Sequence, residues 1–146
     1  MRLTEISVQY NPKQPASSRT KLVTSPDAVK YLREVFNPNT INMQEQVVVL
    51  YLNRGNYILG HQQLSIGGLT CTVLDIRIVL ATALKCLACY IIIAHNHPSG
   101  ELKPSRQDLG ITQQIKKAGE LLDIKLLDHI IITSEGYYSF SDENNI

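Results

Sequence analysis

The chain lacks the charge excess that would point to a nucleic-acid partner. It carries 14 basic and 13 acidic residues, so its net charge is +1, and no long basic block interrupts this balance. Binding of nucleic acid through phosphates therefore has no strong support from composition, although a local basic patch is compatible with it.

Long apolar segments are also missing. The longest apolar region, 73–94, is interrupted by Asp75, Arg77 and Lys85, which argues against a membrane span. Residues 1–5 contain no apolar core of a secretory signal, so we expect a cytoplasmic protein with no membrane partner. With 146 residues, of which 44% are hydrophobic, a single domain with a substantial core is expected.

Cysteine is scarce, and its number is odd. The chain has three cysteines, Cys71, Cys86 and Cys89, which give no disulfide framework. The pair Cys86-x-x-Cys89 suits a redox or zinc motif, but the second pair that a structural zinc site needs is missing. The same spacing puts both residues on neighbouring positions of a helix, as small buried apolar side chains, and we favour this interpretation.

Periodicity and turn residues predict alternating strands and helices. Strands are expected at 4–10, 46–53, 57–64, 90–95, 124–133 and 137–139. Helices are expected from Ser25, as N-cap, to about residue 36, from a Thr72-x-x-Asp75 capping box to about residue 87, and over 105–122. This order predicts an α/β domain of three layers, in which helices flank a mixed sheet.

Two of these helices have distinct patterns. The helix that begins near Thr72 is apolar nearly all round, so we expect it to be buried against the sheet. The helix at 105–122 is amphipathic, and its expected apolar face consists of Ile111, Ile115, Ala118 and Leu122.

One stretch concentrates side chains that bind metals. His95 and His97 follow an apolar run, and Asp108 comes after a loop rich in proline and glycine. If the run is a strand, both histidines point to one face, because side chains alternate. Two imidazoles and a nearby carboxylate form a three-ligand site for a divalent metal, with a position left open for water. Since such a metal can acidify that water into a nucleophile, the stretch predicts a metal-dependent hydrolase.

Simpler explanations exist for the same residues. The histidines are compatible with core or surface positions on a strand, and Ser105-x-x-Asp108 fits a helix capping box. A capping box does not conflict with metal binding, because an aspartate in the first turn can face the histidines across the loop. The letters His95-Asn96-His97 also spell the name of a nuclease motif. On a strand Asn96 points away from both histidines, so we treat that spelling as accidental.

The spacing His-x-His-x7-Ser-x2-Asp resembles the JAMM signature of MPN-domain metalloproteases. The RadC branch of that superfamily is resembled more closely, through the segments 95–100, Pro104-Ser105-x-x-Asp108, 127–132 and 137–140. The resemblance covers roughly residues 25–140. It implies an MPN/JAB domain of the cytidine-deaminase-like fold at 25–146, after an N-terminal extension at 1–24 that holds a strand and a loop.

The resemblance also implies roles for individual residues. The implied ligands of one zinc ion are His95, His97 and Asp108. Ser105 would hold the bound water or the tetrahedral intermediate, and Glu45 would act as the general base. Glu101, inside the motif loop, is the alternative base, and the resemblance favours Glu45.

A further acid–histidine pair, Asp128-His129, lies late in the chain. Adjacent strand residues face opposite sides, so only one of the two can support the site, for instance by fixing the tautomer of a ligand. A buried histidine with an unrelated hydrogen bond is the alternative.

Three functions are compatible with these residues. The first is a zinc metallopeptidase or isopeptidase that acts on a peptide or protein substrate. The second is a role with nucleic acid, because RadC relatives carry a DNA-repair label, but residues 1–24 are too few for the helix-hairpin-helix-like region of longer relatives. The third is a non-catalytic MPN scaffold, although such versions usually lose the ligands that are present here. We expect the first.

Overall fold

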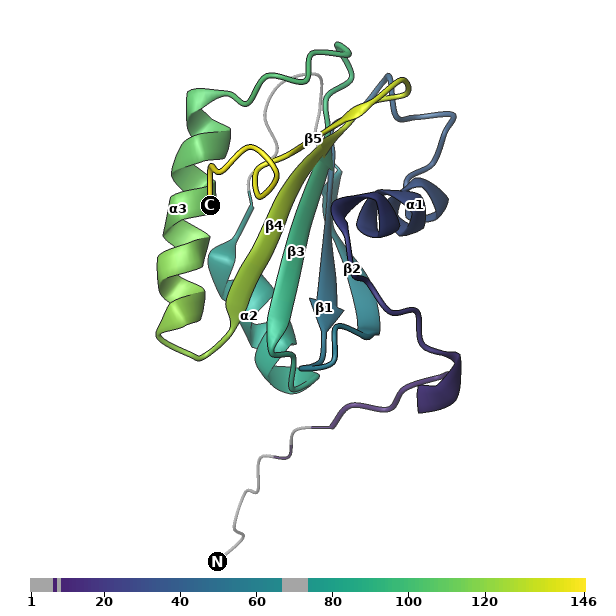
Figure 1. The fold of residues 1–146 in the computed structure, drawn as a ribbon, viewed down its shortest axis with the longest axis vertical. Helices are drawn as coiled ribbons and strands as arrows, with labels where there is room; N and C mark the ends of the chain where they lie inside the picture. The colour runs from purple at the N-terminus through teal and green to yellow at the C-terminus, as the bar shows by residue number, and fades with distance from the viewer. Residues whose placement is uncertain (1–6, 8, 67–73) are drawn as a thin grey trace, which may run out of the picture.

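A mixed sheet of five strands forms the centre of the molecule (Figure 1), in the order β2-β1-β3-β4-β5. The computed structural model describes residues 7, 9–66 and 74–146. Its elements are η1 (Ala16–Ser18), α1 (Ser25–Val35), β1 (Gln46–Leu52), β2 (Ile58–Ile66), α2 (Ile76–Lys85), β3 (Tyr90–Asn96), α3 (Arg106–Glu120), β4 (Lys125–Ile132) and β5 (Tyr137–Ser139).

The pairing of the strands explains where the sheet is mixed. Strand β1 is antiparallel to β2 and to β3, and β5 is antiparallel to β4. Strands β3 and β4 are parallel, because α3 carries the chain back from one end of the sheet to the other. Ile91 pairs with Leu126 and Ile92 with Asp128, so Leu127 is an extra residue that bulges out of β4.

Helices cover both faces of this sheet. Helix α1 lies on one face, and α2 and α3 lie on the other (Figure 1). Each face has its own buried cluster, and alternate residues of β1 and β3 enter one cluster or the other. Strand β3 sends Ile92 and Ala94 toward α1, and Ile91 and Ile93 toward α2 and α3. The predicted three-layer α/β arrangement with a mixed sheet is confirmed.

Helix α1 begins one residue earlier than the sequence predicted. Its N-cap is Thr24, not Ser25, because the carboxylate of Asp27 accepts hydrogen bonds from the Thr24 N–H and the Thr24 hydroxyl, both at 2.9 Å. A cap of this kind satisfies backbone donors that the first helical turn leaves free.

Helix α2 differs from the prediction in length and in burial. Asp75 is the N-cap, since its carboxylate accepts the Arg77 N–H at 2.9 Å, and Thr72 lies outside the described residues. The helix ends at Lys85 rather than near residue 87. Only one side faces the core, so Ile78 and Leu84 are about half exposed, at 48% and 49%. A helix on the surface of a sheet buries one stripe, whatever the composition of its other side.

Helix α3 packs on the sheet through a stripe that the sequence predicted in part. The buried residues are Thr112, Ile115 and Gly119, whereas Leu122 lies beyond the helix and is 43% exposed. A Cβ on Gly119 would lie 2.3 Å from the Ile124 carbonyl oxygen, so glycine allows the helix to approach the chain that returns into β4.

The N-terminal segment does not form the predicted strand where it is described. Most of 4–10 lies outside the described residues, and Ser7, Gln9 and Tyr10 are irregular. Tyr10 instead attaches the segment by its side chain, because its hydroxyl donates to the Leu59 carbonyl at 2.6 Å. None of the helices in the described part of the chain has both the length and the apolar character needed to cross a bilayer.

The spacing of Cys86 and Cys89 predicted that both lie on a helix, but α2 ends before either of them. Cys86 follows α2 as its C-cap and is buried in the core, as expected, and burial raises the pKa of its thiol. Cys89 lies beyond the helix, where its N–H donates to the Leu52 carbonyl at 2.9 Å. Both thiols are free, and Cys71 lies outside the described residues.

Candidate metal centre

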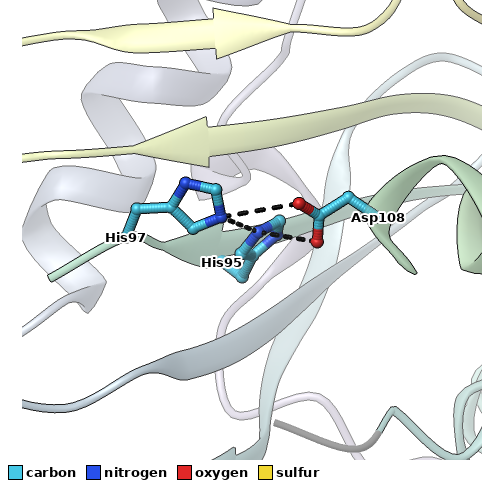
Figure 2. Close-up of side chains that lie close together, drawn as sticks. All are labelled: His95, His97 and Asp108. Carbon is cyan, nitrogen blue, oxygen red and sulfur yellow. Dashed lines mark hydrogen bonds and ion pairs between the residues drawn. The ribbon is translucent and has the colours of Figure 1, made fainter. Parts of the chain in front are cut away.

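Strand β3 delivers two histidines to one end of the sheet. His95 pairs with Val47 of β1 on one side and with Ile131 of β4 on the other, so its backbone is fixed by two neighbours. Its side chain is 4% exposed and faces Asp108 of α3. His97 follows directly after the strand and is half-buried, with its N–H bonded to the Ile132 carbonyl at 3.1 Å. The two rings lie side by side at this end of the sheet, as the alternation of side chains predicted (Figure 2).

Helix α3 supplies the carboxylate from its first turn. The Asp108 carboxylate accepts the Ser105 N–H at 2.7 Å, and the Ser105 hydroxyl accepts the Asp108 N–H at 3.1 Å, which is a capping box. The same carboxylate reaches His95 Nε2 at 3.2 Å and His97 Nε2 at 3.5 Å (Figure 2). The capping box and the predicted ligand set therefore coexist, because the cap holds Asp108 where it faces both rings.

The distances within the cluster suit a small metal ion. The Nε2 atoms of His95 and His97 are 2.9 Å apart, and the three donor atoms lie within 4.8 Å of one another. Metal–ligand bonds of about 2.0–2.1 Å in a tetrahedron place neighbouring donors roughly 3.3 Å apart. Among residues 7, 9–66 and 74–146, this is the one group of three or more His, Cys, Asp or Glu side chains that can hold a metal ion.

The far side of the His97 ring fixes its tautomer. Its Nδ1 lies 2.6 Å from the Glu101 carbonyl oxygen, which can only accept a hydrogen bond. Nδ1 therefore carries a proton, and Nε2, which points toward His95 and Asp108, is the nitrogen through which His97 can bind a metal. A ligating histidine that donates its other N–H to a carbonyl is a common arrangement in metal sites.

A chain of buried hydrogen bonds fixes the tautomer of His95 in the same way. The Thr112 hydroxyl lies 2.6 Å from the Asp108 carbonyl oxygen, to which it must donate, and 2.6 Å from His129 Nδ1, from which it accepts. His129 Nε2 is then unprotonated and accepts from His95 Nδ1 at 2.8 Å. Because Nδ1 is bonded to His129, Nε2 is the nitrogen through which His95 can bind a metal, in place of the hydrogen bond that it donates to Asp108 when no metal is bound.

Burial and the two histidines set the charges. Burial raises the pKa of Asp108, but hydrogen bonds from His95 and His97 outweigh it and hold that pKa well below the ordinary range. The hydrogen bond to Asp108 raises the pKa of His97 against the opposing effect of burial. Desolvation lowers the pKa of His129 well below its ordinary value, and the charge of His95 adds to this. At neutral pH Asp108 is ionised and His129 is neutral, as the hydrogen-bond chain requires.

The two candidate bases occupy different surroundings. Glu45 is half-buried directly before β1. After the larger effect of Asp108, the charge of Glu45 also raises the pKa of His97, which brings this carboxylate into the electrostatic range of the site. Glu101 is exposed, and its carboxylate accepts the Lys103 N–H at 2.9 Å within the loop. Its contribution to the cluster is the backbone carbonyl that holds His97.

Comparison with known proteins identifies the family. A family model described as RadC-like JAB domain matches residues 22–145. The chain belongs to the RadC-like JAB domain family. A UPF0758 protein of Flavobacterium johnsoniae is 45% identical over 123 residues, which cover 84% of this chain and 52% of that relative.

Other RadC-like relatives give a similar picture. A UPF0758 protein of Porphyromonas gingivalis is 46% identical over 101 residues, which cover 68% of this chain and 44% of that relative. One of Chlorobaculum tepidum is 32% identical over an alignment that covers 97% of this chain and 72% of that relative. The chain spans about half the length of the first curated relatives it matches.

The sequence predicted the three converging side chains of this RadC-like JAB domain, the capping box at Ser105 and, as one of two alternatives, the support from His129. The structure brings His95, His97 and Asp108 together, with Ser105 beside Asp108 in the cap. The role of Thr112 is not predicted by the sequence pattern. The spacing Asp108-x-x-x-Thr112 was a usable signal, because residues four apart lie on the same side of a helix.

Proposed function

We propose that this RadC-like JAB domain is a zinc-dependent hydrolase that cleaves an amide bond in a peptide or isopeptide. The observation that supports it is the convergence of His95 Nε2, His97 Nε2 and an Asp108 oxygen, with each ring turned by a hydrogen bond on its far side. Nitrogen and carboxylate donors suit zinc, and three protein ligands are typical of catalytic rather than structural sites.

The residues of the site have complementary tasks in this mechanism. When bound, zinc supplies Lewis acidity and lowers the pKa of a coordinated water. Glu45 accepts a proton from the attacking water and returns it to the leaving amine. The Ser105 hydroxyl oxygen accepts the Asp108 N–H. The hydroxyl proton is not used in that bond, so it would donate to the oxyanion of the substrate.

The experiment that tests this proposal separates metal binding from chemistry. Zinc content is measured in the wild type, His97→Ala and Glu45→Ala, and each protein is then screened with fluorogenic peptides and with lysine isopeptides. We expect about one zinc per chain in the wild type and in Glu45→Ala, and almost none in His97→Ala. Hydrolysis should fall by at least about 100-fold in Glu45→Ala, the usual contribution of a general base.

Two results would contradict the proposal in different ways. Loss of zinc together with activity in Glu45→Ala would make Glu45 a ligand or a structural residue instead of the base. A wild type that takes up no zinc when zinc is supplied would favour a scaffold that binds a partner without catalysis.

A further inference from the structure

Asn96 is a buried polar residue that the metal cluster does not use. It is the last residue of β3, between the two ligating histidines in sequence, and it is 0% exposed. Because side chains alternate along a strand, it points to the α1 side of the sheet while His95 points to the α3 side. A buried amide of this kind must find partners for its donors and its acceptor.

All three partners of Asn96 come from residues 41–46, the segment that leads into β1 and includes its first residue. Its side-chain N–H groups donate to the carbonyl oxygens of Ile41 and Gln44, each at 2.7 Å, and its Oδ1 accepts the Gln46 N–H at 2.7 Å. The orientation of the amide follows, since carbonyls only accept and a backbone N–H only donates. Two of these bonds flank Glu45, one to the residue before it and one to the residue after it.

Strand pairing holds the Glu45 segment on the β2 side, where Gln46 pairs with Ile66, but not on the side of β3. Pairing between β1 and β3 ends at Val47 and His95, one position short of Gln46 and Asn96. The Asn96 backbone pairs with Ile132 of β4 on its other side. The Asn96 side chain therefore supplies the hydrogen bonds that backbone pairing between β1 and β3 does not make here. It joins the strand that carries the histidines to the backbone that carries Glu45.

We infer that Asn96 is a positioning residue, which fixes the Glu45 carboxylate relative to His95 and His97 by holding the backbone on both sides of it. The inference rests on the proposed function for its catalytic meaning. The bonds to Gln44 and Gln46 hold the backbone on both sides of Glu45 next to the strand that carries His95. The asparagine of the His95-Asn96-His97 triplet thus acts on the opposite face from its neighbours, and aligns the base with the ligands.

Asn96→Ala and Asn96→Asp test this inference against a matched control. Alanine removes all three bonds, whereas aspartate retains an acceptor for the Gln46 N–H but sets an oxygen against two carbonyls. The control is Asn53→Ala at the other end of β1, because the Asn53 amide oxygen also bridges backbone groups, the N–H groups of Gly55 and Tyr57 at 2.9 and 3.0 Å. Any general cost of losing a backbone-bridging asparagine appears in both.

The first measurements need neither substrate nor activity. In metal-free protein we expect hydrogen exchange at the Gln46 amide to become faster in Asn96→Ala and to stay unchanged in Asn53→Ala. In zinc-loaded protein the ¹³Cδ resonance of Glu45, assigned with Glu45→Gln, should shift on zinc addition in the wild type and in the control. The shift should shrink in both Asn96 variants, while their zinc content stays at the wild-type value.

Kinetics then tests whether Asn96 acts through Glu45. We expect Asn96→Ala to lower kcat by about tenfold or more with little change in KM, and to cause no further loss in a Glu45→Gln background. Unchanged Gln46 exchange, or an unchanged zinc-induced shift of Glu45, would overturn the positioning role. Multiplicative losses in the double variant would overturn it too, since Asn96 would then act independently of Glu45. If the wild type hydrolyses nothing, the proposed function fails, and the exchange and resonance measurements still decide the positioning.

Discussion

Thr112 is the residue through which helix α3 sets the tautomer of His95. Replacement by valine keeps the volume and removes the hydroxyl that links the Asp108 carbonyl to His129 Nδ1. We expect zinc affinity to fall by about 10–100-fold, the usual effect of losing a group that orients a metal ligand. Competition with a chromogenic chelator measures this. Thr112→Ser keeps the hydroxyl and should bind zinc nearly as the wild type does; equal weakening in both variants would contradict the role of the hydroxyl.

His97 makes zinc binding depend on pH in a definite direction. The hydrogen bond to Asp108 raises the pKa of His97, so the metal-free imidazole keeps its proton to higher pH than an ordinary histidine. Zinc binds the neutral ring and must displace that proton. Zinc affinity should therefore fall as the pH drops through the raised pKa, and level off above it. Calorimetry in buffers of different ionisation enthalpy should show proton release at neutral pH that fades at higher pH; constant release across this range would contradict the assignment.

At the scale of elements, the close contact between α3 and the residue before β4 depends on the absence of a side chain at Gly119. Gly119→Ala would place a Cβ 2.3 Å from the Ile124 carbonyl oxygen, so the helix must shift. We expect a loss of about 1–3 kcal/mol in the free energy of unfolding. Gly110→Ala is the control on the same helix, because a Cβ there meets nothing within 4 Å, and it should stabilise by up to about 1 kcal/mol. Urea unfolding compares the two, and equal effects would contradict the close approach.

The same helix shows which of its buried residues the sequence pattern predicts and which it does not. Its period of 3.6 residues predicted that Ile115 faces the core, and the structure confirms it. The pattern missed Thr112 and Gly119, because a polar residue and a glycine are buried only when a partner across the interface requires them. Those partners, His129 and Ile124, are remote in sequence or lie beyond the end of the helix. Similarly, the apolar composition of α2 gave no information on which of its sides would remain exposed.

For the whole molecule, the candidate centre joins two layers. The histidines lie on the sheet and Asp108 lies on α3, so zinc would bind the folded chain and not the unfolded one. At a free zinc concentration 100 times the dissociation constant, mass action adds about 2.7 kcal/mol to the free energy of unfolding. We expect Tm to rise with zinc in the wild type and to stay constant in His97→Ala, measured by differential scanning calorimetry with and without a chelator. An equal rise in both proteins would place the zinc elsewhere.

Residue spacing predicted the three converging side chains because they lie within a short stretch of chain that a strand and a capped helix hold locally. The prediction of Glu45 came from resemblance to a family, because contacts between segments remote in sequence, the β1–β3 pairing and the hydrogen bonds of Asn96, hold its segment beside β3. Strand alternation allowed a supporting role for one of Asp128 and His129, and the structure assigns it to His129. The support from Asn96 and Thr112 required the three-dimensional arrangement, because each of these side chains acts on a residue from another element.

Because side chains alternate along β3, the position of the His95-Asn96-His97 triplet along the strand decides which face each side chain occupies. His95 and His97 serve one face and Asn96 serves the other, so each residue has a role only in its present phase. One amino acid inserted within β3, upstream of His95, would preserve every letter of the motif and exchange the faces: the imidazoles would turn toward α1 and the amide toward α3. A substitution affects one residue, and its neighbours can compensate for it. A one-residue insertion disrupts the metal cluster and the Asn96 hydrogen bonds together. Insertions and deletions in β3 should therefore be far less tolerable than its chemical composition suggests.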